Sequence, residues 1–334
     1  MTRRDRTTGL PGAQRGRRAA ARAGEGDGFS VQRLARFGII GVAVTALLVV
    51  VALLAYNWYD SSIAQPGKTV LRVGEEEFSL SYYAARLPEF ARAEGATSGL
   101  LLTDALLGKL EEEGLVLTAA AERGIVLSDD DVTAAIAVWL GVPLDTSRGS
   151  LFDSRYRDEL RNSGLSDSHY REQTRAREAE TRLRESLREE IGETGALLHL
   201  RVVTAATLEE AEALRARIDE GEDMGTIAQV DSLHEESRQN DGLWTVPPAL
   251  IEAALQDVLA SAEEGTLLDP VEAGGAFWVI RLETRETAGT YTDRDIAELT
   301  ELRFEEAIEA ARERVTIERD FTTDDANWAI EEAS

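Results

Sequence analysis

The longest uninterrupted apolar stretch of the chain lies near its N-terminus, where residues 37–56 read FGIIGVAVTALLVVVALLAY without a charge. At a helical rise of about 1.5 Å per residue, this length spans a hydrocarbon core of about 30 Å. The pattern predicts a transmembrane helix over 37–59, with Trp58 and Tyr59 as an interfacial anchor. The rival interpretation is a signal peptide cleaved at 62–64, although an apolar signal core usually has only about 7–15 residues.

Beyond a linker at 60–69, the apolar positions follow first a strand period and then helical periods. Alternation at 70–73 predicts a short strand, and a helix is expected to begin near Ser79 or Ser81. Leucines then recur every four positions from residue 102, which predicts a second helix. Two glycines that follow are interpreted as local stops, namely Gly114 and Gly124.

Two long charged segments, 166–190 and 292–319, predict helices that bracket the middle of the chain. Each has one apolar stripe on an otherwise charged surface, which is typical of a helix packed along one side. The stripes consist of Leu183, Leu187 and Ile191 in the first segment and of Phe304, Ile308, Ala311 and Val315 in the second. A further helix is expected after Ser128, an N-cap residue followed by three aspartates.

The segment between the two charged helices has a different sequence pattern, in which short β-branched runs alternate with short helical patterns. The expected strands lie at 199–203, 242–246, 267–271 and 276–283, and the expected helices at 207–220, 224–231 and 248–259. A turn at 272–275 joins the last two strands. Alternation without a repeated βαβ unit predicts an α+β fold with a mostly antiparallel sheet.

Charge is divided unevenly along the chain. Residues 1–36 hold nine arginines and three acids, a net charge of +6. Since the whole chain has a net charge of −26, residues 37–334 have a net charge of −32. An acidic body repels phosphate backbones, which argues against nucleic acid as a partner. The basic tail is too poor in apolar residues to fold and is expected to be disordered. By the positive-inside rule, it places the N-terminus in the cytoplasm and the body outside the cell membrane.

Cysteine is absent from the sequence. This excludes disulfides, a thiolate nucleophile, cysteine-ligated zinc and a lipidated cysteine. Any chemistry of this chain is therefore free of thiols.

Four phrases between residues 196 and 287 resemble the parvulin family of prolyl isomerases in sequence and in order. The first strand of the family, A-x-H-I-L-V, is similar to 196–202, which contains His199. The phrase G-x-D-F-x-x-L-A-x-x-x-S is similar to 221–232, and G-x-x-S-x-P-V is similar to 265–271. The last strand, G-x-H-I-I-K, is similar to 276–281. The resemblance implies a parvulin-like domain over 196–287.

The flanking segments resemble extracytoplasmic chaperone-isomerases of the SurA and PrsA type, above all the run GLVLTAAAERGIVLSDDDVTAAI. The resemblance implies a helical chaperone domain over 70–195, into which the parvulin-like domain is inserted. In that group a C-terminal helix returns to the helical domain, which gives 288–334 a role. The expected order is therefore a tail at 1–36, a membrane helix, a linker, the helical domain at 70–195, the parvulin-like domain at 196–287 and the returning segment at 288–334.

Parvulin sites use two histidines that face one another, beside an acid or a cysteine. Here the resemblance places His199 at the first histidine position and His234 at the acid or cysteine position, and it implies that both act in catalysis. The last-strand histidine is replaced by Trp278. The apolar proline slot is expected to consist of Leu243, Trp244, Leu250 and Trp278.

Prolyl isomerisation places few demands on such a site. The barrier of about 18–20 kcal/mol arises from amide resonance, so neither a nucleophile, a metal nor a cofactor is required. The site must hold the proline ring in a dry slot and favour the twisted amide over both planar forms. Apolar side chains beside a polarising histidine fit this task.

Each candidate residue also has a structural interpretation. His199 is alternatively a packed histidine of the sheet, and no H-x-x-x-H or H-E-x-x-H spacing supports it as a metal ligand. His234 is alternatively a surface residue of a charged loop. Trp278 is alternatively a buried aromatic that fills the space of the missing imidazole.

The leading hypothesis is a membrane-anchored folding factor that isomerises X-Pro bonds in unfolded, newly exported proteins. A second hypothesis is a holdase with an inactive parvulin domain, and a third is an envelope scaffold whose acidic helices hold one folded partner. The first two hypotheses differ in turnover, and the third predicts no affinity for unfolded chains. The oligomeric state is left open by the sequence.

Overall fold

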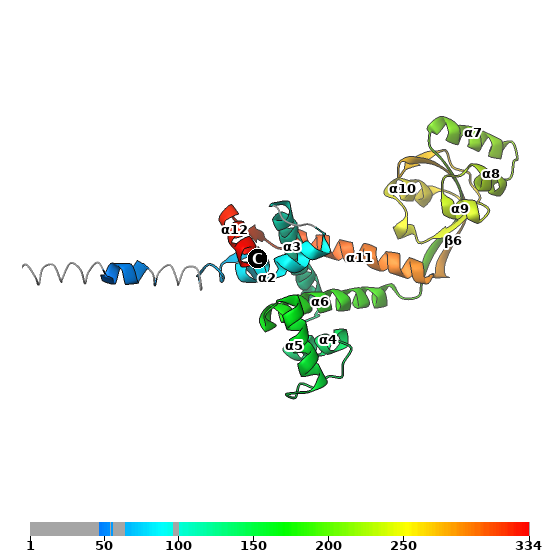
Figure 1. The fold of residues 1–334 in the computed structure, drawn as a ribbon. Coiled ribbons are helices and arrows are strands. Elements are labelled where there is room, and N and C mark those ends of the chain that lie inside the picture. The colour runs from blue at the N-terminus through cyan, green and yellow to red at the C-terminus, as the bar shows by residue number, and fades with distance from the viewer. Residues whose placement is uncertain (1–46, 54, 56–63, 96–99, 334) are drawn as a thin grey trace, which may run out of the picture. The chain divides into compact units, whose positions relative to one another are not determined.

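The computed structural model describes residues 47–53, 55, 64–95 and 100–333. Its contacts divide the chain into one unit over residues 1–64 and another over 65–334, and the architecture below is that of the second (Figure 1). Most of the predicted membrane segment 37–59 lies outside the described residues, as does the whole tail, and residues 47–53 within that segment are helical. Among the described residues no helix is both long and apolar enough to cross a bilayer.

A three-stranded antiparallel sheet begins the second unit, with strand order β2-β1-β7. The strands are β1 (Thr69–Val73), β2 (Glu76–Ser79) and β7 (Ile317–Arg319). The central strand confirms the prediction at 70–73. Gly74 turns the chain between β1 and β2 with a φ of +61°, a left-handed conformation that favours glycine.

Five helices follow this hairpin, namely α2 (Leu80–Ala93), α3 (Leu100–Glu122), α4 (Asp129–Trp139), α5 (Leu151–Ser163) and α6 (Asp167–Ile191). Ser128 caps α4 in a reciprocal capping box with Asp131, as its pattern predicts. The stop expected at Gly114 is wrong, because α3 continues to Glu122. A Cβ at Gly114 would lie 2.7 Å from the Cβ of Val73, so this glycine lets the helix approach β1.

The chain returns to these helices after the second sheet. Helix α11 (Asp293–Arg314) packs on α6 and α3, and α12 (Thr323–Glu332) packs on α2. The helix predicted over 292–319 therefore ends five residues early. The β-branched run that follows it, Val315 to Ile317, leads into β7, which pairs with β1.

A four-stranded antiparallel sheet carries the inserted region, with order β4-β3-β6-β5. Its strands are β3 (Thr194–Ala205), β4 (Leu243–Val246), β5 (Val271–Ala273) and β6 (Ala276–Thr290). Its helices are α7 (Leu208–Asp219), α8 (Met224–Asp231), α9 (Glu235–Gln239), the 3₁₀ turn η2 (Pro248–Leu250) and α10 (Ala253–Ser261). The α+β class and the antiparallel sheet are thus confirmed.

Two local predictions in this region are wrong. The helix expected over 248–259 begins as η2, and α10 starts only at Ala253. The strand expected over 267–271 is reduced to one bridge between Leu267 and Arg281, and β5 starts at Val271.

The register of β3 assigns its side chains to two apolar layers. Leu198, Leu200 and Val202 pack with Leu255 and other residues of one core, and Val203 packs in the other core with residues of α7 and α8. Because successive strand residues point to opposite faces, two adjacent residues of β3 face different layers. This alternation decides which side chains can share a site.

Candidate active site

His234 stands at the start of α9, where it is the N-cap residue. Its Nδ1 accepts a hydrogen bond from the backbone N–H of Ser237 at 3.3 Å. A neutral imidazole that accepts at Nδ1 carries its proton at Nε2, so the ring offers one N–H donor away from the helix.

Three buried hydroxyl residues fix the backbone beneath this ring, namely Thr204, Ser232 and Ser237. The Ser232 hydroxyl accepts from the N–H of Thr204 at 3.1 Å and from the N–H of His234 at 3.2 Å. The Ser237 hydroxyl donates to the carbonyl of His234 at 3.1 Å. Loop and sheet are thereby joined without a buried charge.

The ring of His234 lies against two tryptophans. The centroid of the imidazole is 5.0 Å from that of Trp244 and 5.1 Å from that of Trp278, and the two indoles are 5.5 Å apart. The indole N–H of Trp278 donates to the carbonyl of Ala273 at 3.0 Å, which fixes its ring across the β5–β6 hairpin. All three rings are half-buried. We call His234, Trp244 and Trp278 the aromatic cluster.

Burial lowers the pKa of His234 below its ordinary value, and of its two charged neighbours Glu236 raises that pKa and Arg294 lowers it. The guanidinium of Arg294 forms an ion pair with Glu236 at 3.2 Å, which partly cancels both influences. The imidazole is therefore neutral near pH 7 and serves as a hydrogen-bond donor without charge.

The structure brings four of the six predicted site residues together. Trp244, Trp278 and Leu250 are half-buried members of one apolar core, and His234 contacts both tryptophans. Leu243 is 37% exposed and lies outside this group. The side chains of Leu243 and Trp244 lie on opposite faces of the sheet, because adjacent residues of β4 point to opposite sides.

His199 lies on the face of the sheet opposite to the aromatic cluster. It pairs with Thr245 of β4, whereas Leu200 pairs with Trp244. Its Nδ1 is 3.1 Å from the Thr245 hydroxyl, and its Nε2 is 3.1 Å from a carboxylate oxygen of Glu286. The expectation that His199 and His234 surround one slot is therefore not met, and a catalytic role of His199 stays a prediction.

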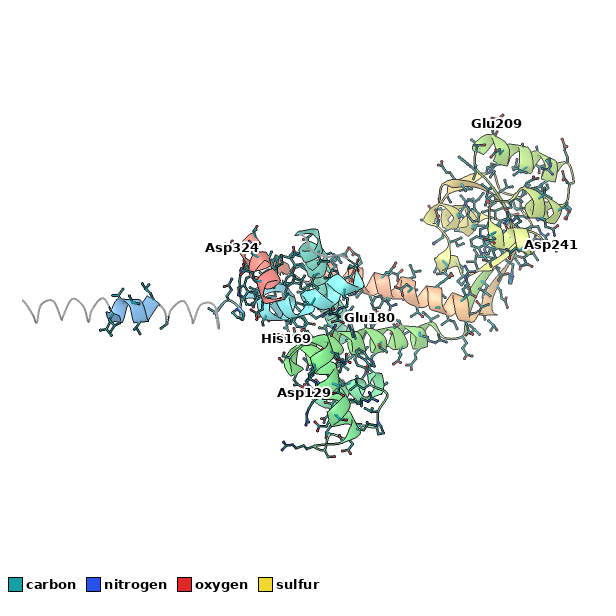
Figure 2. The ribbon with its side chains drawn as sticks, in the orientation of Figure 1. Asp129, His169, Glu180, Glu209, Asp241 and Asp324 are labelled. Atoms are coloured by element: carbon teal, nitrogen blue, oxygen red, sulfur yellow. The ribbon has the colours of Figure 1, made fainter. Side chains whose placement is uncertain are left out.

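The third histidine belongs to the helical part of the chain. His169 of α6 lies 5.5 Å from Tyr82 between ring centroids, and Figure 2 labels it among the helices. Within the described residues, no group of three histidine or acidic side chains is arranged to hold a metal ion.

Asp241 adds a feature that the sequence did not reveal. It has a φ of +53° and leads into Gly242, and its carbonyl accepts from the guanidinium of Arg201 at 2.9 Å. This left-handed turn directs the chain from α9 into β4 and so positions Trp244. The buried Ser237 was missed as well, although a serine three residues after an N-cap is a visible sequence signal.

Two family models match the chain. The model of the PPIC-type PPIase domain matches residues 201–284, and the model of the SurA-like N-terminal domain matches residues 30–184. The first match contains the aromatic cluster and begins two residues after His199.

The chain therefore combines a PPIC-type PPIase domain with a SurA-like N-terminal domain. The comparison with curated proteins gave no match.

Several solved structures are similar to this chain. The peptidylprolyl isomerase PrsA from Bacillus anthracis shares 13% identity, covers 68% of this chain and 95% of its own, and has a TM-score of 0.41. The parvulin domain of PpiD from E. coli shares 21% identity over 29% of this chain and 93% of its own, with a TM-score of 0.25. A SurA-like chaperone of Campylobacter jejuni shares 15% identity over 74% and 95%, with a TM-score of 0.27.

Proposed function

We propose that this protein isomerises X-Pro bonds of unfolded, newly exported proteins at the aromatic cluster. The observation that supports this proposal is the contact of a neutral, half-buried imidazole with two indole rings inside the matched isomerase domain. Two indole faces offer the apolar surface that a pyrrolidine ring requires. The Nε2–H of His234 provides one donor at the edge of that surface.

The chemistry follows from differential binding of the twisted amide. Rotation about the C–N bond localises the nitrogen lone pair and removes the resonance that makes the planar forms stable. An apolar surface that excludes water raises the energy of the polar planar amide relative to the twisted form. A donor that contacts the twisted form better than the planar forms lowers the barrier, by about 1.4 kcal/mol for each tenfold gain in rate.

The proposal places the body of the protein outside the cell membrane. The uncharged stretch 37–56 supports one membrane helix, and the nine arginines before it support a cytoplasmic N-terminus. We assign residues 60–69 as a linker, 70–195 as the chaperone domain, 196–287 as the isomerase domain and 288–334 as the segment that completes the chaperone domain. A chain that lacks residues 1–64 is expected to leave the membrane fraction.

A holdase without turnover is the second candidate function. It is favoured by the replacement of the last-strand histidine by Trp278 and by the position of His199 on the opposite face, since the facing pair of histidines is then absent. No comparable observation supports the scaffold hypothesis. None supports Leu243 as part of the proline slot either.

Prolyl exchange of a short X-Pro peptide, followed by NMR with catalytic amounts of the full chain, separates these functions. Acceleration of exchange supports the isomerase. Suppression of aggregation of a denatured test protein without acceleration supports the holdase, and the absence of both contradicts the proposal.

A further inference from the structure

Helices α4 and α5 and the loop between them form a lobe of the helical part (Figure 1). The lobe has a small core of its own, in which Val132 and Ile136 of α4 pack with Phe152 of α5. Ala85 packs against this core, so the lobe adjoins α2, the helix that follows the first hairpin. We call residues 138–155, which comprise the end of α4, the loop and the start of α5, the α4–α5 junction.

The α4–α5 junction exposes a local concentration of apolar side chains. Within residues 64–95 and 100–333, nine large apolar side chains are exposed, and four of them lie in the fourteen residues from 138 to 151. These four are Val138, Trp139, Leu144 and Leu151, with exposed fractions of 75%, 40%, 56% and 56%. Single exposed apolar residues are normal on a protein surface, whereas a concentration of them marks a site of interaction.

The junction also provides positive charge that no acid neutralises. Among the described residues, the exposed side chains of Arg148 and Arg155 have no ion-pair or hydrogen-bond partner. These two arginines balance the two aspartates of the junction, so it is neutral, whereas residues 37–334 as a whole have a net charge of −32. An anionic surface is therefore not repelled here, and two guanidinium groups are free to bind its phosphates.

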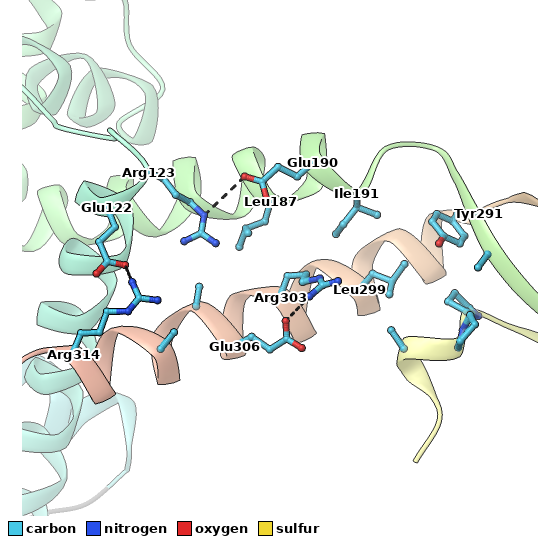
Figure 3. A pocket seen from close by; sticks show the side chains of 16 residues that line it. Glu122, Arg123, Leu187, Glu190, Ile191, Tyr291, Leu299, Arg303, Glu306 and Arg314 are labelled. Carbon is cyan, nitrogen blue, oxygen red and sulfur yellow. Dashed lines mark hydrogen bonds and ion pairs between the residues drawn. The ribbon is translucent and has the colours of Figure 1, made fainter. Parts of the chain in front are cut away.

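Arginines of the cleft that α6 and α11 line lack this freedom (Figure 3). In that cleft, of about 890 Å³, Arg303 lies 2.7 Å from Glu306 and Arg123 lies 4.0 Å from Glu190. A ligand phosphate would have to compete with these carboxylates. The unpaired arginines of the junction are available without such competition.

We infer that the α4–α5 junction contacts the surface of an anionic lipid bilayer. At such a surface, apolar side chains enter the boundary between headgroups and acyl chains, tryptophan favours this depth, and arginines bind the phosphate oxygens of the headgroups. The eighteen residues of the junction provide all three kinds of group. This inference goes beyond the proposed function and rests on it only for the membrane helix.

The proposed membrane helix favours a bilayer over another partner for this surface. The helix ends near Tyr59, and the ten residues of the linker 60–69 span at most about 36 Å when fully extended. Such a short tether holds the following domain close to the bilayer and raises the effective concentration of lipid around it. A freely diffusing protein has no such advantage.

A single fluorescent label tests the contact, because the chain has no cysteine of its own. The fluorophore nitrobenzoxadiazole is attached to Leu144→Cys in the junction, and the matched control carries it on Ala213→Cys, an exposed position of α7. The full chain is reconstituted into phosphatidylcholine vesicles with or without phosphatidylglycerol. Lipids with a nitroxide on the acyl chain quench a fluorophore that enters the bilayer, and flotation of the same vesicles reports whether the chain is anchored.

The label at position 144 is expected to be quenched in the anionic vesicles, less so at high salt, and the label at position 213 is expected to stay unquenched. Arg148→Glu together with Arg155→Glu should lower the equilibrium constant of the contact about 25-fold or more, since each arginine contributes about fivefold at an anionic surface. The matched control is Arg188→Glu, the same reversal at an exposed arginine of α6 that also has no acidic partner among the described residues. It should leave the quenching unchanged.

Three outcomes would overturn the inference. A chain that floats with the vesicles but shows no quenching at position 144 contradicts the lipid contact and leaves the membrane helix intact. A label at position 144 that responds to a denatured protein or to chain concentration, and not to the nitroxide lipid, assigns the junction to a protein partner instead. A chain that floats with neither vesicle contradicts the membrane helix and, with it, the lipid contact.

Discussion

The helical part and the isomerase part of this chain bury polar groups in opposite ways. In the helical part, the guanidinium of Arg86 donates to both carboxylate oxygens of Glu113 at 3.0 and 2.9 Å, and both residues are less than 10% exposed. In the isomerase part, the buried polar groups beneath the aromatic cluster are the hydroxyls of Thr204, Ser232 and Ser237. The difference separates a scaffold held by charges from a binding surface that is kept neutral.

The buried charges of the helical part join distant segments of the chain. Glu111 of α3, 6% exposed, accepts from Arg312 at 2.9 Å and from Arg319 at 2.6 Å. These arginines lie about 200 residues further along the chain, in α11 and β7. Since an unpaired buried charge is costly, such pairs favour one particular return of the C-terminal segment. Substitutions in the two parts are therefore expected to change different properties.

The largest effect on stability is expected from Glu113→Ala. Removal of one partner from a buried ion pair leaves the Arg86 guanidinium without the Glu113 carboxylate, at a cost of about 3–5 kcal/mol in the free energy of unfolding, although the Tyr82 hydroxyl still accepts a hydrogen bond from it. Denaturant unfolding measures this loss. The double variant Arg86→Met with Glu113→Leu is the control, because it removes both charges and should recover most of the stability. Equal loss in both variants would show that packing and not charge pairing is responsible.

The largest effect on exchange is expected from Trp278→Ala. Loss of one indole face should lower the prolyl exchange rate about tenfold or more, equal to about 1.4 kcal/mol or more in barrier height. Trp278→Phe keeps an apolar ring and should retain part of the rate. Trp328→Ala in α12, another half-buried tryptophan, is the control and should lower stability without an effect on exchange. Unchanged exchange in Trp278→Ala would argue that this residue only fills the core.

A smaller effect, confined to the helical part, is expected from Glu172→Gln. Burial, reinforced by the carboxylate of Glu113, raises the pKa of Glu172 to about 7. The folded state thus binds a proton that the unfolded state releases near pH 4.5, so stability falls as pH rises from about 4.5 to about 7. Partial exposure reduces the full linkage to about 1–2 kcal/mol.

Unfolding measured at several pH values checks this expectation. Glu172→Gln should be more stable than the wild type at pH 8 and should have a flatter stability profile across that interval. Prolyl exchange at pH 8 should be the same in both proteins, because Glu172 lies in α6 outside the isomerase sheet. A steeper profile in the variant would contradict the assignment.

The sequence predicted the composition of the isomerase region better than its geometry. The phrases around His234, Trp244 and Trp278 identified all three members of the aromatic cluster. The register of β3 was not visible, and a shift in its pairing with β6 occurs between His199 and Leu200. A change of one residue in register moves a side chain to the other face, so no sequence pattern separated His199 from the cluster.

In the helical part, the apolar stripes predicted α6 and α11 because a helical period is a local signal. Strand β7 was missed because its formation depends on pairing with β1, which lies far away in the sequence. Gly114 was misread for the same reason: its role is a close approach to Val73, which only the folded chain reveals. Non-local contacts thus account for the main errors in both parts.

The central claim is that the face with His234, and not the face with His199, carries the activity. The most direct test is NMR exchange of a short X-Pro peptide by the wild type, His234→Asn and His199→Ala. Asparagine retains an acceptor for the N–H of Ser237 but removes the imidazole that contacts both tryptophans. We predict that His234→Asn loses most of the acceleration and that His199→Ala keeps it. The opposite result, full activity without His234 and loss without His199, would contradict this account.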